Sequence, residues 1–127
     1  IVCLFNAWSY HQLSTVVPPS ICVAIDAKRK VVIPSTVPIE IYYWKKENLE
    51  FGITDAEISG FKVRITDLER SVCDAVKYRN KIGLDTTAEI IRNYLKKDKR
   101  NLSRLSEYAK RLRVANTLKN YLMIAIE

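Results

Sequence analysis

The stretch ISGFKVRITDLER, residues 58–70, marks the point where the chain changes from strand-like to helix-like sequence. Residues 58–61 are typical of a hairpin turn, and residues 62–65 alternate polar and apolar side chains, which predicts a strand. Thr66 and Glu69 then have the spacing of a capping box, in which Thr66 is the N-cap of a helix. The stretch therefore predicts a hairpin followed directly by a helix.

Upstream of this point the pattern indicates one helix and several short strands. Ile1, Leu4, Phe5 and Trp8 recur at helical spacing, which predicts an amphipathic helix that ends near residues 12–13. Short runs rich in β-branched and aromatic residues then predict strands. These runs cover residues 21–25, 31–33 and 39–44, with a brief extended stretch at 49–53.

Downstream the pattern is helical throughout. The capped helix carries Leu68, Val72, Ala75 and Val76 on one stripe, and Gly83 is expected to end it. Three further helices are expected. The first begins at Thr86, with Glu89 as its capping partner. The second begins at residue 101 or 102, and the third runs from Val114 to about Ile126. The sequence thus predicts an α+β fold: an N-terminal helix, a small mixed or antiparallel sheet of about four to five short strands, and four C-terminal helices, in one domain over residues 1–127.

The positive charge of the chain is concentrated in one segment. The 127 residues have a net charge of +7, and residues 96–119 contain nine basic residues against two acidic ones, while the remainder is balanced. The basic residues are Lys96, Lys97, Lys99, Arg100, Arg104, Lys110, Arg111, Arg113 and Lys119. A patch of one sign on a neutral body favours an anionic partner, either nucleic acid or an acidic protein face; the alternative is a merely solvated helix face.

The composition argues against several classes of chemistry. Cys3, Cys22 and Cys73 are odd in number and lack CxxC spacing, which predicts buried thiols in a reducing cytoplasm rather than disulfides or a zinc site. His11 is the only histidine, and we expect a polar or capping role for it. Three glycines leave no room for a glycine-rich phosphate loop, and no apolar run is long enough to cross a bilayer. We therefore expect no metal, no cofactor and no membrane association.

One catalytic arrangement remains as an alternative. A metal-dependent nuclease requires an acidic residue on one strand and an acidic residue with a nearby lysine on the next, to hold a divalent cation beside a water. Asp26, Lys28 and Glu40 come closest to this pattern, although no lysine follows two residues after Glu40.

Three stretches of the chain together resemble a known family. They are residues 1–25, residues 57–74 (EISGFKVRITDLERSVCD) and residues 77–85 (KYRNKIGLD). They are similar to the C-terminal domain of AbiEi-type antitoxins, the transcriptional regulators of type IV toxin–antitoxin systems that act in abortive phage infection. The resemblance implies a non-enzymatic cytoplasmic domain that counteracts a nucleotidyltransferase-like toxin. It also implies that operator DNA is bound mainly by an N-terminal winged helix, which is absent from this chain.

Two groups of residues are the candidates for contact with a partner. Arg104, Lys110, Arg111 and Arg113 supply the charge of the basic segment. Tyr78, Arg79, Asn80 and Lys81 form a polar turn within the stretch that most resembles the family, and we expect them to form a contact surface. A general nucleic-acid-binding accessory domain is a further alternative to the antitoxin hypothesis.

Overall fold

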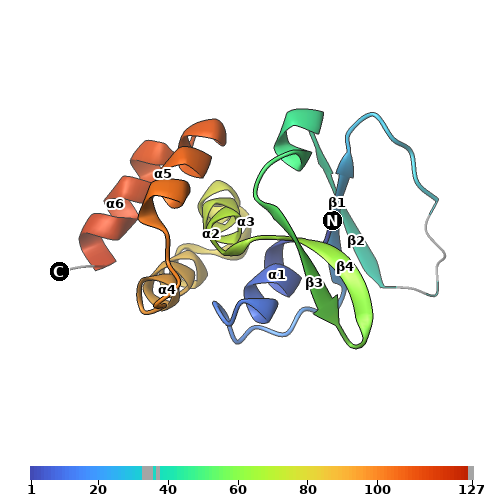
Figure 1. Ribbon diagram of the computed structural model, residues 1–127, viewed down its shortest axis with the longest axis horizontal. Helices are drawn as coiled ribbons and strands as arrows, with labels where there is room; N and C mark the ends of the chain where they lie inside the picture. The colour runs from blue at the N-terminus through green and yellow to red at the C-terminus, as the bar shows by residue number, and fades with distance from the viewer. Residues whose placement is uncertain (33–35, 37, 126–127) are drawn as a thin grey trace.

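The computed structural model describes residues 1–32, 36 and 38–125, and these form a mixed α+β fold (Figure 1). In chain order the elements are α1 (Leu4–Tyr10), β1 (Ile21–Asp26), β2 (Ile39–Trp44), the 3-10 helix η1 (Lys46–Leu49), β3 (Ile53–Ile58), β4 (Phe61–Thr66), α2 (Leu68–Lys77), α3 (Arg79–Ile82), α4 (Leu84–Leu95), α5 (Leu102–Arg111) and α6 (Ala115–Ala125). The strands lie at one end of the molecule and α4, α5 and α6 at the other, with α2 between them (Figure 1).

The strands form two pairs. β1 and β2 are parallel, in a register that runs from Ile21 opposite Ile39 to Asp26 opposite Trp44, and β3 and β4 are antiparallel. Val2 makes isolated bridges to Val23 in β1 and to Ile65 in β4, so the first residues of the chain lie between the two pairs. The predicted α+β class is confirmed, but the strands are arranged as two small sheets rather than one sheet of four to five strands.

The β3–β4 hairpin forms where the sequence predicts it. Ser59 and Gly60 connect the strands, and both have positive φ angles, of 51° and 82°. A two-residue turn with positive φ at both positions has the twist that suits an antiparallel pair. The hairpin register then places Ile58 opposite Phe61.

The predicted capping box at the start of α2 is wrong. The N-cap is Asp67, whose carboxylate accepts a hydrogen bond from the backbone N–H of Arg70 at 2.8 Å. Thr66 instead remains in β4, because its N–H donates to the carbonyl of Val2 and its hydroxyl is buried against that of Ser71. Its pairing with Ile53 in the hairpin register and with Val2 keeps Thr66 in the strand and moves the helix start by one position.

Three helix boundaries also differ from the prediction. α2 ends at Lys77, and the short α3 separates it from Gly83, which has a φ of 94° and ends α3. α4 then begins at Leu84, two residues before the expected N-cap Thr86. Five α-helices therefore follow β4 in the described residues, instead of four.

The N-terminal half contains smaller corrections. α1 begins at Leu4 because residues 1–3 are extended between the strand pairs. The expected extended stretch at 49–53 is mostly non-extended: η1 ends at Leu49, and β3 begins only at Ile53. The sequence also predicts a strand at 31–33, but Val31 and Val32 are exposed and outside any strand, and Ile33 lies outside the described residues. Ile126, the expected end of the last helix, also lies outside the described residues.

A buried arginine joins α2 to the strand end of the molecule. The guanidinium of Arg70 donates to the Asp74 carboxylate at 3.0 Å and to the backbone carbonyls of Asn48 and Phe51 at 2.6 and 3.0 Å. The rings of Trp44 and Phe51 each lie 4.5 Å from the guanidinium carbon. Burial raises the pKa of the Asp74 carboxyl, and the charge of Arg70 opposes this shift. Both side chains of this pair are only 1% exposed.

This pair should therefore have a large effect on stability. Arg70→Ala leaves the Asp74 carboxylate buried without its partner, so we expect the free energy of unfolding to fall by about 3–5 kcal/mol in chemical denaturation. The matched control is Glu107→Ala, which breaks another i,i+4 pair, Glu107–Arg111, whose side chains are more than half exposed. That substitution should change stability by about 0.5 kcal/mol or less. Equal effects of the two substitutions would contradict the structure around Arg70.

A glycine beside Arg70 provides a second test. Gly52 has a φ of 67°, and a Cβ there would lie 2.6 Å from the Cβ of Arg70. Gly52→Ala should therefore cost about 3 kcal/mol or more, because the left-handed backbone and the overpacking are both unfavourable. Gly60→Ala is the control: it has a similar φ of 82° but open space around it, and should cost only about 1 kcal/mol. The difference between the two variants in thermal or chemical denaturation measures the packing against Arg70.

Candidate binding surface

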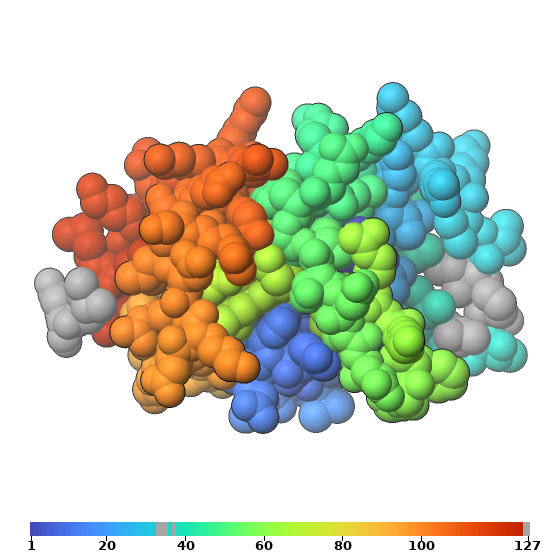
Figure 2. Space-filling view, in the orientation of Figure 1, coloured from blue at the N-terminus to red at the C-terminus, as the bar shows by residue number. Residues whose placement is uncertain are grey.

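The basic segment covers the loop between α4 and α5, all of α5 and the start of α6. Helical spacing in the sequence predicts an apolar stripe of Leu102, Leu105, Ala109 and Leu112, and the last three are buried, whereas Leu102 at the start of α5 is 52% exposed. Asn101 caps the helix by accepting a hydrogen bond from the backbone N–H of Arg104. The basic side chains of α5, Arg104, Lys110 and Arg111, are exposed, and α5 lies at the helical end of the molecule (Figure 2).

Arg104 and Arg111 line one hollow with two aromatic residues. Phe51 and Tyr108 belong to the same hollow, which has a volume of about 410 Å³. Each arginine has an acidic neighbour: Arg104 lies 3.7 Å from Glu69, and Arg111 lies 3.5 Å from Glu107. Because both guanidinium groups are about half exposed, these pairs leave donor positions open to an anion.

Lys110 and Arg113 lie in a different hollow. Its volume is about 450 Å³, and Asn116 and Thr117 of α6 complete its lining. The four cations that the sequence grouped together therefore divide into two pairs, one on each side of α5.

The backbone of Arg113 has a left-handed conformation. It follows the C-cap Leu112 with a φ of 60°, and its N–H donates to the carbonyl of Lys110 while that of Val114 donates to Ala109. These two bonds form a Schellman motif, whose left-handed position is usually glycine. The exposed side chain of Arg113 thus occupies a position that the fold itself would fill better with glycine.

The polar turn at residues 78–81 has mainly intramolecular contacts. The Tyr78 hydroxyl accepts a hydrogen bond from the indole N–H of Trp44 at 2.9 Å, and Arg79 donates to the carbonyl of Val76 at 2.8 Å. Lys81 donates to the Glu40 carboxylate at 2.8 Å and to the Tyr42 hydroxyl at 2.7 Å.

The pairing of Lys81 with Glu40, 41 positions apart in the chain, has no signal in the sequence. The hydrogen bond from Lys81 lowers the pKa of Glu40. Asn80 is exposed and has no side-chain hydrogen bond within the described part of the chain. This turn therefore attaches α3 to β2. Its solvent-exposed part consists of Asn80 and the outer side of Lys81.

The nuclease alternative is not supported by the positions of its residues. Glu40 lies opposite Cys22 in the parallel register, four residues along β1 from Asp26, a separation of about 13 Å. Asp26 instead accepts a hydrogen bond from the backbone N–H of Lys28, as a turn-forming residue does. Over residues 1–32, 36 and 38–125, no three His, Cys, Asp or Glu side chains are close enough to share a metal ion.

The histidine and the cysteines have structural surroundings. His11 Nε2 lies 2.8 Å from the carbonyl of Thr66, which requires a hydrogen on that nitrogen, and burial lowers the pKa of the ring. Cys3, Cys22 and Cys73 are all buried, as the sequence predicts, and burial raises the pKa of each thiol. A thiol with a raised pKa is a poor nucleophile at neutral pH.

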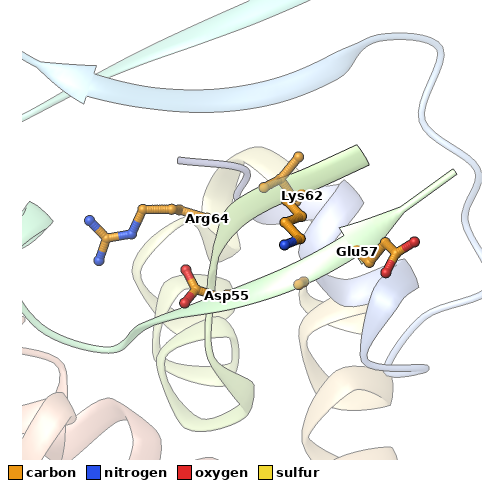
Figure 3. Close-up of a pocket in the computed structure, with 6 residues that line it drawn as sticks. Asp55, Glu57, Lys62 and Arg64 are labelled. Carbon is orange, nitrogen blue, oxygen red and sulfur yellow. The ribbon is translucent and has the colours of Figure 1, made fainter. Parts of the chain in front are cut away.

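A further hollow lies on the β3–β4 hairpin, with a volume of about 510 Å³ (Figure 3). Asp55 is opposite Arg64 in the register, and Glu57 is opposite Lys62. Opposite charges therefore alternate across the two strands, and this hollow has no excess of either sign. The segment from residue 96 to residue 119 differs because its cations outnumber its carboxylates nine to two.

No helix in the part of the chain that the structure describes is both long enough and apolar enough to cross a bilayer. No family model matches the chain, and no curated protein matches it at a significant level.

The left-handed position of Arg113 leads to a stability prediction. A non-glycine side chain at positive φ costs about 1–2 kcal/mol, which glycine avoids. Glycine also gives the unfolded chain more conformational freedom, which offsets part of this gain. Arg113→Gly should therefore raise the free energy of unfolding by about 0.5–1 kcal/mol. Gln12 is the matched control, because it has a φ of 57° in an equivalent Schellman motif after α1. Gln12→Gly should give the same increase in melting temperature without removing a charge. A loss of stability in Arg113→Gly alone would mean that the arginine side chain contributes to the fold.

Proposed function

We propose that this chain is a non-enzymatic antitoxin and transcriptional-regulator domain of a type IV toxin–antitoxin system. In this proposal it counteracts a nucleotidyltransferase-like toxin in the cytoplasm, and an N-terminal winged helix outside the chain reads most of the operator. The observation that carries the proposal is the separation of charge: the entire excess of +7 lies in residues 96–119, which comprise the α4–α5 loop, α5 and the start of α6. The resemblance of three stretches to the AbiEi family supplies the biological setting.

The basic surface would act by electrostatic docking. Arg104 and Arg111 are about half exposed and each can place two parallel N–H donors on a carboxylate or a phosphate. The partner would be the acidic face of the toxin or the phosphate backbone of the operator, where the domain assists autoregulation. Phe51 and Tyr108 beside the arginines give this surface a partly apolar floor.

The proposal is non-enzymatic because the catalytic arrangement suggested by the sequence is divided in the fold. Asp26 and Glu40 lie at opposite ends of the β1–β2 pair, and Glu40 is bonded to Lys81. The proposal therefore assigns a binding role to the basic surface.

A general nucleic-acid-binding role is the second candidate, favoured by the α4–α5 loop. Lys96, Lys97 and Lys99 line a hollow of about 710 Å³ together with Arg104, although Asp67, Glu69 and Asp98 also belong to it. Three lysines on one loop suit sequence-independent contact with phosphates.

The proposal predicts that reversing the charge of the surface abolishes function. In cells that express the full-length regulator with its toxin, the triple variant Arg104→Glu, Arg111→Glu, Arg113→Glu should no longer restore growth. For operator DNA, the slope of log Kobs against log salt should become smaller by about 3, since each phosphate contact contributes about 0.9. Circular dichroism should show that the variant remains folded.

The matched control reverses three exposed cations in the β1–β2 connection, Lys28, Arg29 and Lys30. It changes the net charge equally and should leave both growth and the salt slope unchanged. If the two triple variants behave alike, the basic segment is only a solvated face and the proposal is wrong. Loss of random-duplex binding together with normal growth would favour the second candidate.

A further inference from the structure

A groove runs between α5 and α6, on the other side of α5 from the hollow that contains Arg104 and Arg111. Its volume is about 320 Å³. Its walls are formed by Leu102, Ser106 and Ala109 of α5 and by Ala115, Lys119 and Leu122 of α6. Leu105 and Leu118 form its floor and are almost fully buried. The two helices lie at the outer end of the molecule (Figure 1), and all described residues that line the groove belong to α5 or α6.

The groove is apolar and lined in its centre by small side chains. Ser106, Ala109 and Ala115 allow a second backbone to approach closely, as small residues do at helix contacts. Leu102 at one edge is 52% exposed. Met123, four residues after Lys119 and so on the same side of α6, is 55% exposed. This is the form of a surface that accepts the apolar face of another helix.

The charges around the groove have one sign. Lys119 is in its wall, and Lys110 and Arg113 line the adjoining hollow, which shares Ala115 and Asn116 with the groove. Among the residues that the structure describes, no carboxylate lines the groove or that hollow. A second copy of this chain that docked through the same face would bring these cations together, which is unfavourable.

We propose that the α5–α6 groove binds an amphipathic helix of a partner protein, with carboxylates next to its apolar stripe. The apolar stripe fills the groove, and the carboxylates reach Lys119 and the Lys110–Arg113 hollow. This goes beyond the proposed function, whose main cations, Arg104 and Arg111, line the hollow on the other side of α5 and which shares only Arg113 with the groove side. It identifies the kind of segment that a protein partner would present.

The probe is a synthetic helical peptide of about 15 residues, with leucines at positions i, i+3, i+4 and i+7 and glutamates beside them at one end. Its affinity for the full chain is measured by fluorescence anisotropy. Ser106→Trp, which fills the groove, and Lys119→Glu, which reverses the charge of its wall, should each weaken binding at least tenfold. Asn120→Trp, at an exposed position of α6 outside the groove, should leave the affinity within about twofold. The same peptide with lysines in place of glutamates should bind at least tenfold more weakly than the acidic one.

Several results would overturn the proposal. They are the absence of peptide binding, equal binding of the acidic and basic peptides, and binding that is unaffected by Ser106→Trp. A concentration-dependent dimer in sedimentation that Ser106→Trp abolishes would assign the groove to a second copy instead. Binding to phosphatidylglycerol vesicles that Ser106→Trp abolishes would assign it to an anionic membrane surface.

The peptide assay and the growth assay can contradict their two proposals independently of each other. The double variant Arg104→Glu, Arg111→Glu changes the other side of α5 and should bind the peptide normally. A groove that does not bind the peptide leaves the growth prediction intact, and the reverse is also true.

Discussion

The buried guanidinium of Arg70 is the interaction on which the other contacts between the two ends of the molecule depend. A buried charge is costly unless its hydrogen bonds are satisfied, so the groups around it must stay in place. These groups come from separate parts of the chain: Asp74 from α2 itself, the carbonyls of Asn48 and Phe51 from either side of the turn after η1, and the ring of Trp44 from β2. The first helix of the helical half is thereby fixed to β2 and to the connection between β2 and β3. The close approach of Gly52 to the Arg70 side chain follows from the same arrangement.

This arrangement also positions the basic surface. α5 packs on α2, and its Tyr108 hydroxyl donates to the N-cap carboxylate of Asp67 at 2.9 Å, a buried environment that raises the pKa of Tyr108 to about 12. Phe51 has the buried Arg70 on one side at 4.5 Å and lies 5.1 Å from the exposed Arg111. The same aromatic ring therefore contacts the cation that holds the fold together and a cation proposed to bind a partner. A change at Phe51 or Asp67 would alter the orientation of the binding face as well as stability.

The elements that follow from local sequence were predictable, and those that depend on distant contacts were not. The turn at Ser59 and Gly60, the apolar stripe of α5 and the confinement of charge to residues 96–119 can all be recognised in the sequence. The burial of the Arg70–Asp74 pair could not, because i,i+4 spacing is the same on a buried and on an exposed helix face. The same limit explains Thr66, which remains in a strand because it pairs with Ile53 in β3 and donates to the carbonyl of Val2.

The candidate site shows this division most clearly. Counting charges locates the basic segment, and helical spacing places Arg104 and Arg111, seven residues apart, on one face. The hollow around Lys110 and Arg113 also needs residues of α6, which sequence spacing within α5 does not supply. The groove between these helices has the same origin, since its wall residues are ordinary stripe positions in each helix taken alone. Arg113 connects the two features. Its left-handed backbone ends α5 and begins the turn into α6, at a position where glycine would be more stable. An arginine at this position gives up stability and adds an exposed charge beside the groove, so its side chain contributes more to the surface than to the fold.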